Sequence, residues 1–177
     1  MTDTPRKGMM PALDQILPDA VAGKTPKPDR RALTAAARFY AVQALFQMEV
    51  SGQTIEAVRR EFEAHRIGVE TEAEAWVDAD IGKFRALIEG AVDNQAAVDQ
   101  LTDRGLVAKW PIDRIDPTLR ALFRAAGAEM LAGKTPPRVI ITEFVRIAEA
   151  FFPEGREPKF VNAVLDHMAH DAKPGGF

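Results

Sequence analysis

The sequence contains no cysteine, only three histidines and no apolar run of membrane-spanning length. The lack of cysteine excludes disulfides, thiolate zinc sites and cysteine nucleophiles. A membrane-spanning helix needs about 20 consecutive, mainly apolar residues, and the N-terminal stretch also lacks the uninterrupted apolar segment of a signal peptide. These absences predict a soluble, cytoplasmic protein.

The residues that are present are typical of a globular protein, with 46% hydrophobic and 28% charged side chains among 177 residues. A chain of this length buries roughly two-thirds of its unfolded surface, so it folds without cross-links. The formal net charge is −3, but residues 1–31 carry six basic and four acidic side chains, whereas residues 54–80 carry three and eight. The mildly basic N-terminal part is a first, weak indication of an anionic partner.

Proline and hydrophobic periodicity divide the chain into regions. Five of the twelve prolines lie in residues 1–28, which predicts a flexible leader because proline fixes φ and removes a backbone donor. From residue 29 onward apolar residues recur at helical spacing, and no stretch alternates convincingly, so we expect no sheet. The predicted fold is all-α with about seven helices, in an N-terminal bundle over residues 29–105 and a C-terminal bundle over 106–170, followed by a tail over 171–177.

Capping residues mark several predicted helix ends. Asp29 is a good N-cap for the first long helix, and Gly52 is a typical stop for it. Thr71 and Glu74 form a capping-box pattern, which predicts a helix that begins near Trp76.

A phosphate-binding loop is excluded in the second half of the chain. Residues 127–135 read GAEMLAGKT, with five residues between the glycines where that loop has four, and a strand would have to precede it. Here a helix precedes it instead. That helix opens at Asp116-Pro117, with proline at its first position, and Gly133 is explained as its stop.

Titratable side chains do not form a catalytic or metal-binding constellation. His167 and His170 are three residues apart but have no evident third ligand, and Asp166 is well spaced to pair with His170. Glu143 lies on the most apolar helix, where burial would raise its pKa as in a catalytic acid. A salt bridge from Glu143 to an arginine such as Arg124 or Arg146 is the favoured interpretation, because buried acids are normally paired. We expect no enzyme, no cofactor and no metal.

Basic residues near the start of the first long helix are candidates for binding an anion. Arg31 and Arg38 fall on one helix face, and Arg30 and Lys27 lie near the helix N-terminus, where backbone amides favour phosphates. Arginine also stacks on unpaired RNA bases. An ordinary solvated face is the alternative.

A second cation lies beside an aromatic residue at the start of the last helix, where Lys159 and Phe160 could contact a base. Phe160 alone is also compatible with a hydrophobic staple onto the core.

Three segments together resemble the NusB transcription antitermination family. Residues 37–46, ARFYAVQALF, are similar to the first-helix signature of that family. Residues 110–116, WPIDRID, lead into Leu122-Phe123-Arg124 and Glu129 as in its central block, and residues 160–166, FVNAVLD, match its C-terminal string. The segments occur in the family's order and span residues 30–170.

The resemblance implies two small helical bundles packed together and no catalysis. It also implies binding of the boxA RNA element together with NusE, a small-subunit ribosomal protein, and through this complex an indirect action on the RNA polymerase elongation complex. The RNA-binding residues implied by the motif match and its surroundings are Lys27, Arg30, Arg31, Arg38, Lys159 and Phe160. The NusE-binding residues implied are Phe46, Asp116, Leu119 and Arg120.

One departure from the family pattern supports a second hypothesis. Residues 35–37 are alanines where many members cluster arginines, and each lost phosphate contact weakens RNA binding. Together with the acidic residues 54–80, this favours a helical protein–protein adaptor that has lost most RNA binding. A homodimer is also compatible with the sequence.

Overall fold

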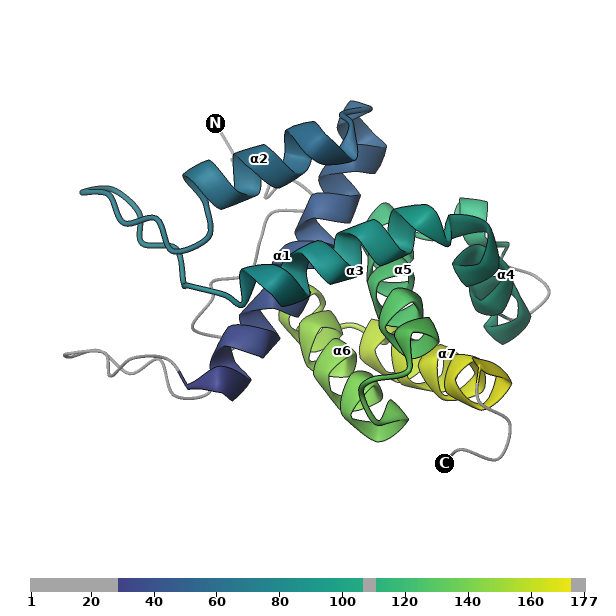
Figure 1. The fold of residues 1–177 in the computed structure, drawn as a ribbon. Coiled ribbons are helices and arrows are strands. Elements are labelled where there is room, and N and C mark those ends of the chain that lie inside the picture. Colours follow the sequence, from purple (N-terminus) through teal and green to yellow (C-terminus); the bar gives the residue numbers. More distant parts are fainter. Residues whose placement is uncertain (1–28, 107–110, 173–177) are drawn as a thin grey trace, which may run out of the picture.

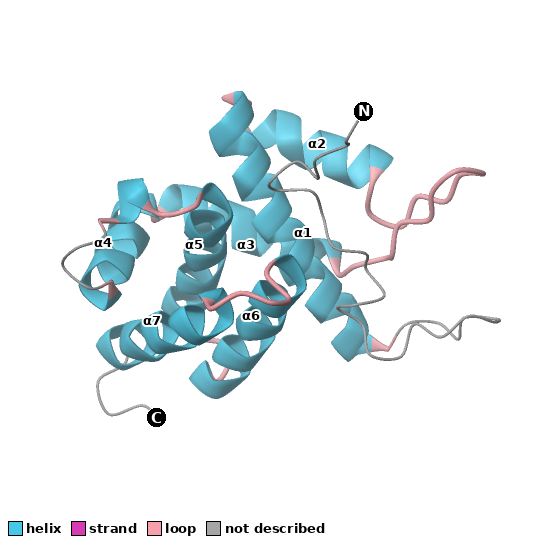
Figure 2. Cartoon of the chain, turned by 180° about the vertical axis from the view of Figure 1, so that it is seen from behind, coloured by secondary structure: helices cyan, strands magenta, loops and turns pink. Residues whose placement is uncertain are grey.

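A computed structural model describes residues 29–106 and 111–172 (Figure 1). Within these residues the chain is all-α, as predicted, and Figure 2 shows the same arrangement of helices from behind. The predicted leader and Lys27 lie outside the described residues. The elements are α1 (Arg30–Ser51), α2 (Ile55–His65), α3 (Ile81–Asp93), α4 (Gln95–Gly105), the 3₁₀ helix η2 (Ile112–Arg114), α5 (Pro117–Ala132), α6 (Pro137–Phe151) and α7 (Glu157–Ala172).

The helix ends confirm most of the capping predictions. The Asp29 side chain accepts a hydrogen bond from the Ala32 amide, and Asp116 accepts one from the Thr118 amide at the start of α5. α1 and α5 end at Gly52 and Gly133 with φ values of 72° and 71°, in the left-handed region that glycine adopts without strain.

The start of α3 corrects one prediction. The helix begins at Ile81 and not near Trp76, because Asp80 is the residue that caps it. The Thr71 hydroxyl does accept from the Glu74 amide, but the Thr71 amide also donates to the Glu74 carbonyl, which closes a turn. The backbone then folds back, with the Trp76 amide bonded to the Val69 carbonyl. The same local hydrogen bond that caps a helix therefore stabilises a turn here.

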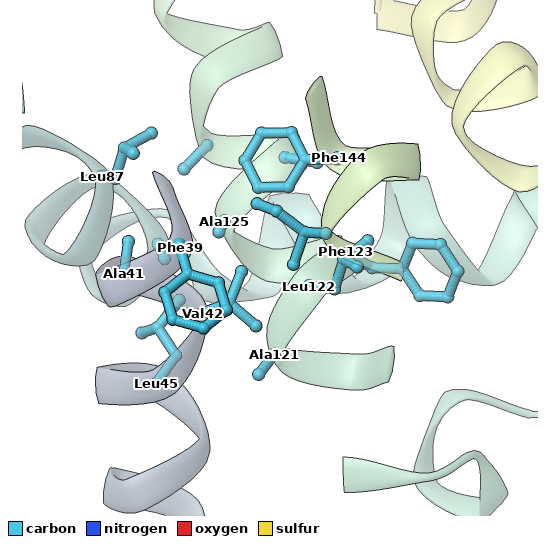
Figure 3. Close-up of a cluster of buried hydrophobic side chains, with 14 of the residues drawn as sticks. Phe39, Ala41, Val42, Leu45, Leu87, Ala121, Leu122, Phe123, Ala125 and Phe144 are labelled. Carbon is cyan, nitrogen blue, oxygen red and sulfur yellow. The ribbon is translucent and has the colours of Figure 1, made fainter. Parts of the chain in front are cut away.

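Helix α5 is the central element of the core. Eleven of its sixteen residues are buried, and it packs against α1, α3, α4, α6 and α7. Figure 3 shows Phe39 and Val42 of α1, Leu122 of α5 and Phe144 of α6 in one buried cluster. Because this cluster includes helices of both predicted bundles, the position of the boundary between them stays a prediction.

α7 includes residues 171 and 172, so the helix extends two residues into the predicted tail. The domain bounds themselves stay predictions. Among the described residues, no helix has the length and apolar character that a membrane crossing requires.

The close contact between α4 and α5 depends on Gly127. A Cβ atom placed on Gly127 would lie 2.6 Å from Val98 Cγ1, which is too close for any real contact. On α3, a Cβ on Gly90 would lie 3.5 Å from Ala128 Cβ, an ordinary contact distance. A methyl group thus fits at Gly90 but not at Gly127 without movement of its neighbours.

We expect Gly127→Ala to lower the free energy of unfolding by about 1–3 kcal/mol, because Val98 or α4 must move to admit the methyl group. The matched control Gly90→Ala should be neutral or stabilising by up to about 1 kcal/mol, since alanine is the better helix former. Urea denaturation of both variants checks the difference. Equal stability of the two would contradict it.

Candidate nucleic-acid interface

The first turn of α1 presents two exposed arginines. Arg30 and Arg31 are both exposed, and the Asp29 cap fixes the start of their helix. The amides of a first helical turn have no partner within the helix and carry a partial positive charge. Guanidinium groups at this end therefore add to a field that already attracts anions.

Arg38 lies on the same face of α1 but is buried, with 5% of its surface exposed. Its guanidinium makes a bidentate ion pair with Glu129 of α5, with Nε 2.9 Å from Oε2 and Nη2 2.8 Å from Oε1. Arg38 Nη1 also lies 3.7 Å from the Glu143 carboxylate of α6. Arg38, a predicted RNA-binding residue, therefore does not lie on the surface with Arg31, because α5 and α6 cover this face of α1 at the turn of Arg38.

The Glu129 carboxylate collects donors from several elements. Its Oε1 accepts from Lys83 Nζ of α3 at 2.6 Å and from the Thr135 hydroxyl at 2.9 Å, in addition to Arg38. Burial disfavours the ionised carboxylate, but the hydrogen bonds and positive charges of Arg38 and Lys83 outweigh it and hold the pKa of Glu129 below its ordinary value of 4.5. The cluster thus joins α1, α3 and α5 through one ionised group.

Glu143 is paired as predicted, and its partner is Arg146, at 3.4 Å. Arg124, the other predicted partner, instead binds Asp99 and Glu49. The Glu143 carboxylate thus lies between Arg38 and Arg146.

The second predicted RNA group lies apart from the first. Lys159 is exposed, whereas Phe160 is partly buried and packs edge-to-face on Phe123 of α5, with 6.1 Å between ring centroids. In Figure 1 the first turn of α1 lies at the lower left edge of the molecule, and α7 begins near its centre. Phe160 fits the staple interpretation, and the structure does not bring Lys159 together with Arg30 and Arg31.

The four residues assigned to a partner have unequal roles. Leu119 is buried, Asp116 caps α5, and Arg120 binds Glu49 and the carbonyls of Ile112 and Ile115. These three side chains are occupied within the chain. Phe46, in contrast, is partly exposed.

Phe46 also lines a groove of about 170 Å³, together with Val50, Thr118, Phe151 and other residues of α1. The wall of this groove includes Gln43, whose side-chain amide atoms are buried and have no hydrogen-bond partner among the described residues. A buried amide left unpaired is costly.

Lys83 and Gln43 were not identified as site residues from the sequence. Lys83 lies in a helix with ordinary amphipathic spacing, and Gln43 is one letter of a helical signature. Neither residue type marks a site without knowledge of the neighbouring helices.

The predicted pairing of His170 with Asp166 is present in the structure. The ring Nδ1 of His170 lies 3.7 Å from the Asp166 carboxylate.

We expect Glu129→Gln to lower the free energy of unfolding by about 3–5 kcal/mol at neutral pH, because it leaves the buried Arg38 charge without its main counter-ion. The folded-state pKa of Glu129 lies below the unfolded value. Its stabilisation is therefore complete above the unfolded pKa and is lost as pH falls through the folded pKa. Urea denaturation across acid pH should show a smaller pH dependence in the variant.

Glu63→Gln is the matched control, since Glu63 pairs with the more exposed Arg85. Solvent screens this pair, so its loss should destabilise much less. A Glu129 variant as stable as the Glu63 variant would show that the buried cluster contributes little.

Comparisons with known proteins agree with this architecture. The NusB family model matches residues 35–170. A transcription antitermination protein NusB from Maricaulis maris is 47% identical over 160 residues, covering 89% of this chain and 99% of that protein. T. maritima NusB is 29% identical with a TM-score of 0.63, covering 86% of this chain and 96% of its own. In a crystal structure of NusB and NusE with dsRNA, one chain shares the fold (TM-score 0.63, 20% identity, 77% and 96% coverage). The chain belongs to the NusB family.

Proposed function

We propose that this protein is an RNA-binding transcription antitermination factor that binds the boxA element of ribosomal RNA operons together with NusE. Membership of the NusB family carries the proposal. A protein of the same fold has been crystallised with NusE and dsRNA, which supports both partners. The role is regulatory rather than catalytic and belongs in the cytoplasm, with the RNA polymerase elongation complex reached through the RNA.

The exposed first turn of α1 is the RNA-binding surface in this proposal. Arg30 and Arg31 supply charge at a helix N-terminus, and Lys159, at the start of α7, is a separate exposed cation for another part of the RNA. Arg38 does not contact the RNA in this proposal. It supports the surface by fixing α1 against α5 through its ion pair with Glu129. Contacts from arginine and lysine bind the RNA phosphates, so the RNA affinity falls steeply as the salt concentration rises.

The groove at Phe46 is the NusE-binding surface in this proposal. It combines the partly exposed Phe46 ring with apolar neighbours such as Val50 and Phe151. Aromatic anchors dominate protein interfaces, and Phe46 supplies such a ring. Asp116, Leu119 and Arg120 support this surface by holding the start of α5 in place.

The direct test is fluorescence anisotropy of labelled boxA RNA, titrated with this protein alone and with NusE added, at two salt concentrations. Salt-sensitive binding that tightens with NusE is expected. No binding in either case, with NusE still captured in a pull-down, would contradict RNA binding and indicate the adaptor instead.

We expect Arg31→Gln to weaken RNA binding across sequences, because it removes a phosphate contact. The slope of log affinity against log salt should become shallower by about 0.7. The matched control is Arg104→Gln on α4, at the opposite side of the molecule in Figure 1. Equal losses in both variants would rule out a local patch at α1.

We expect Phe46→Ala to weaken NusE binding tenfold or more, as loss of a hot-spot aromatic anchor typically costs about 2 kcal/mol or more. RNA binding by the protein alone should stay unchanged. Leu131→Ala, at an exposed apolar residue near the end of α5, is the control. Pull-down titration with NusE measures the difference, and thermal melting confirms that both variants are folded.

A further inference from the structure

The face of α1 that carries Arg31 also carries the charge cluster. Arg31 and Arg38 are seven residues apart, so they differ by only about 20° around the helix and by about 10 Å along it. At Arg38 this face is covered by Glu129 of α5 and Glu143 of α6. Lys83 reaches the same cluster from α3, with its amine on Glu129. The Lys83 amine therefore lies next to the face of α1 that carries Arg31 and Arg38.

A second contact places the start of α3 beside the first turns of α1. The amide of Asp80, the N-cap of α3, donates to the carbonyl of Leu33 at 3.1 Å. Lys83 follows three residues later, and its side chain is 21% exposed, whereas that of Arg38 is 6% exposed. Lys83 thus provides the solvent-accessible cation at the position along α1 where Arg38 points inward.

The charges in the cluster do not cancel. Three cations face two carboxylates; the cations are Arg38, Lys83 and Arg146, and the carboxylates are Glu129 and Glu143. One positive charge is left over. Arg146 is held to α6 by its i,i+3 pair with Glu143, so Lys83 is the partly exposed cation of the cluster on the side of the first turns of α1.

Release of Lys83 from Glu129 leaves the carboxylate satisfied. Glu129 keeps both hydrogen bonds from Arg38 and the one from the Thr135 hydroxyl. The lysine stem is flexible and its ammonium is a compact point charge. The amine can therefore turn toward a second anion without leaving a buried charge unpaired.

We propose that Arg31 and Lys83 together form a binding site for the phosphodiester backbone of the RNA. The inference rests on the proposed RNA-binding function and adds a residue from α3 to it. The two cations contact phosphates of the same strand, which runs along the exposed side of α1. Contacts of this kind position the RNA and do not read its sequence.

Lys83→Gln tests the proposal, because glutamine removes the charge and keeps a polar, although shorter, side chain at this position. RNA affinity should fall, and the salt slope should become shallower by about 0.7. Lys83→Arg should restore the slope, and the Arg31→Gln/Lys83→Gln double variant should lose about twice as much slope. A merely structural role of Lys83 would lower the melting temperature and leave the salt slope unchanged, which would overturn the site.

Chemical labelling of the unmodified protein provides a second measurement that needs no variant. An amine-reactive reagent should modify Lys83 several-fold more slowly when boxA RNA is bound, as followed by mass spectrometry. Binding of RNA by the wild type with no protection of Lys83 and no effect of Lys83→Gln would overturn this inference alone. Failure of the wild type to bind RNA would instead overturn the proposed function.

Discussion

The buried pairing of Arg38 with Glu129 is the interaction on which the arrangement of the helices depends. It joins the first long helix to the central helix across 91 residues of sequence, and it draws Lys83 and Thr135 to the same carboxylate. A charge removed from water at this depth is tolerated only because its partner forms a two-pronged hydrogen bond. Each helix in the cluster is thus fixed in rotation as well as in position.

This constraint shapes the proposed RNA surface. Arg38 serves the surface by holding α1, and the exposed charges come from residues around it. Arg31 lies two turns earlier on α1, and Lys83 arrives from α3, so the surface is built from two helices. A few contacts to phosphates then suffice to attract the RNA to this surface. The net charge of −3 of the whole chain is compatible with RNA that is bound jointly with NusE.

The proposed partner surface is separate from the cluster and depends on α5 in another way. Arg120 bonds to the carbonyls of Ile112 and Ile115 and to Glu49, which fixes η2 and the end of α1 against the start of α5. The hydrogen bond from Arg120 helps to hold the pKa of Glu49 below its ordinary value. With these side chains occupied, the groove and its partly exposed Phe46 ring are left for a partner.

The sequence by itself determined the helical class and most helix ends, because hydrophobic periodicity, N-caps such as Asp29 and stops such as Gly52 act through local backbone chemistry. It also carried the family motifs.

The tertiary structure decided whether a charged side chain faces solvent or the protein interior. Arg31 and Arg38 share a helix face in sequence, yet of these two arginines it is Arg38 that pairs with Glu129 and Glu143. The Thr71 hydroxyl likewise supports a turn or a helix equally well, and the fold-back of Trp76 onto Val69 chose the turn. Contacts outside the local motif select between such alternatives, because the spacing of a few residues does not determine them.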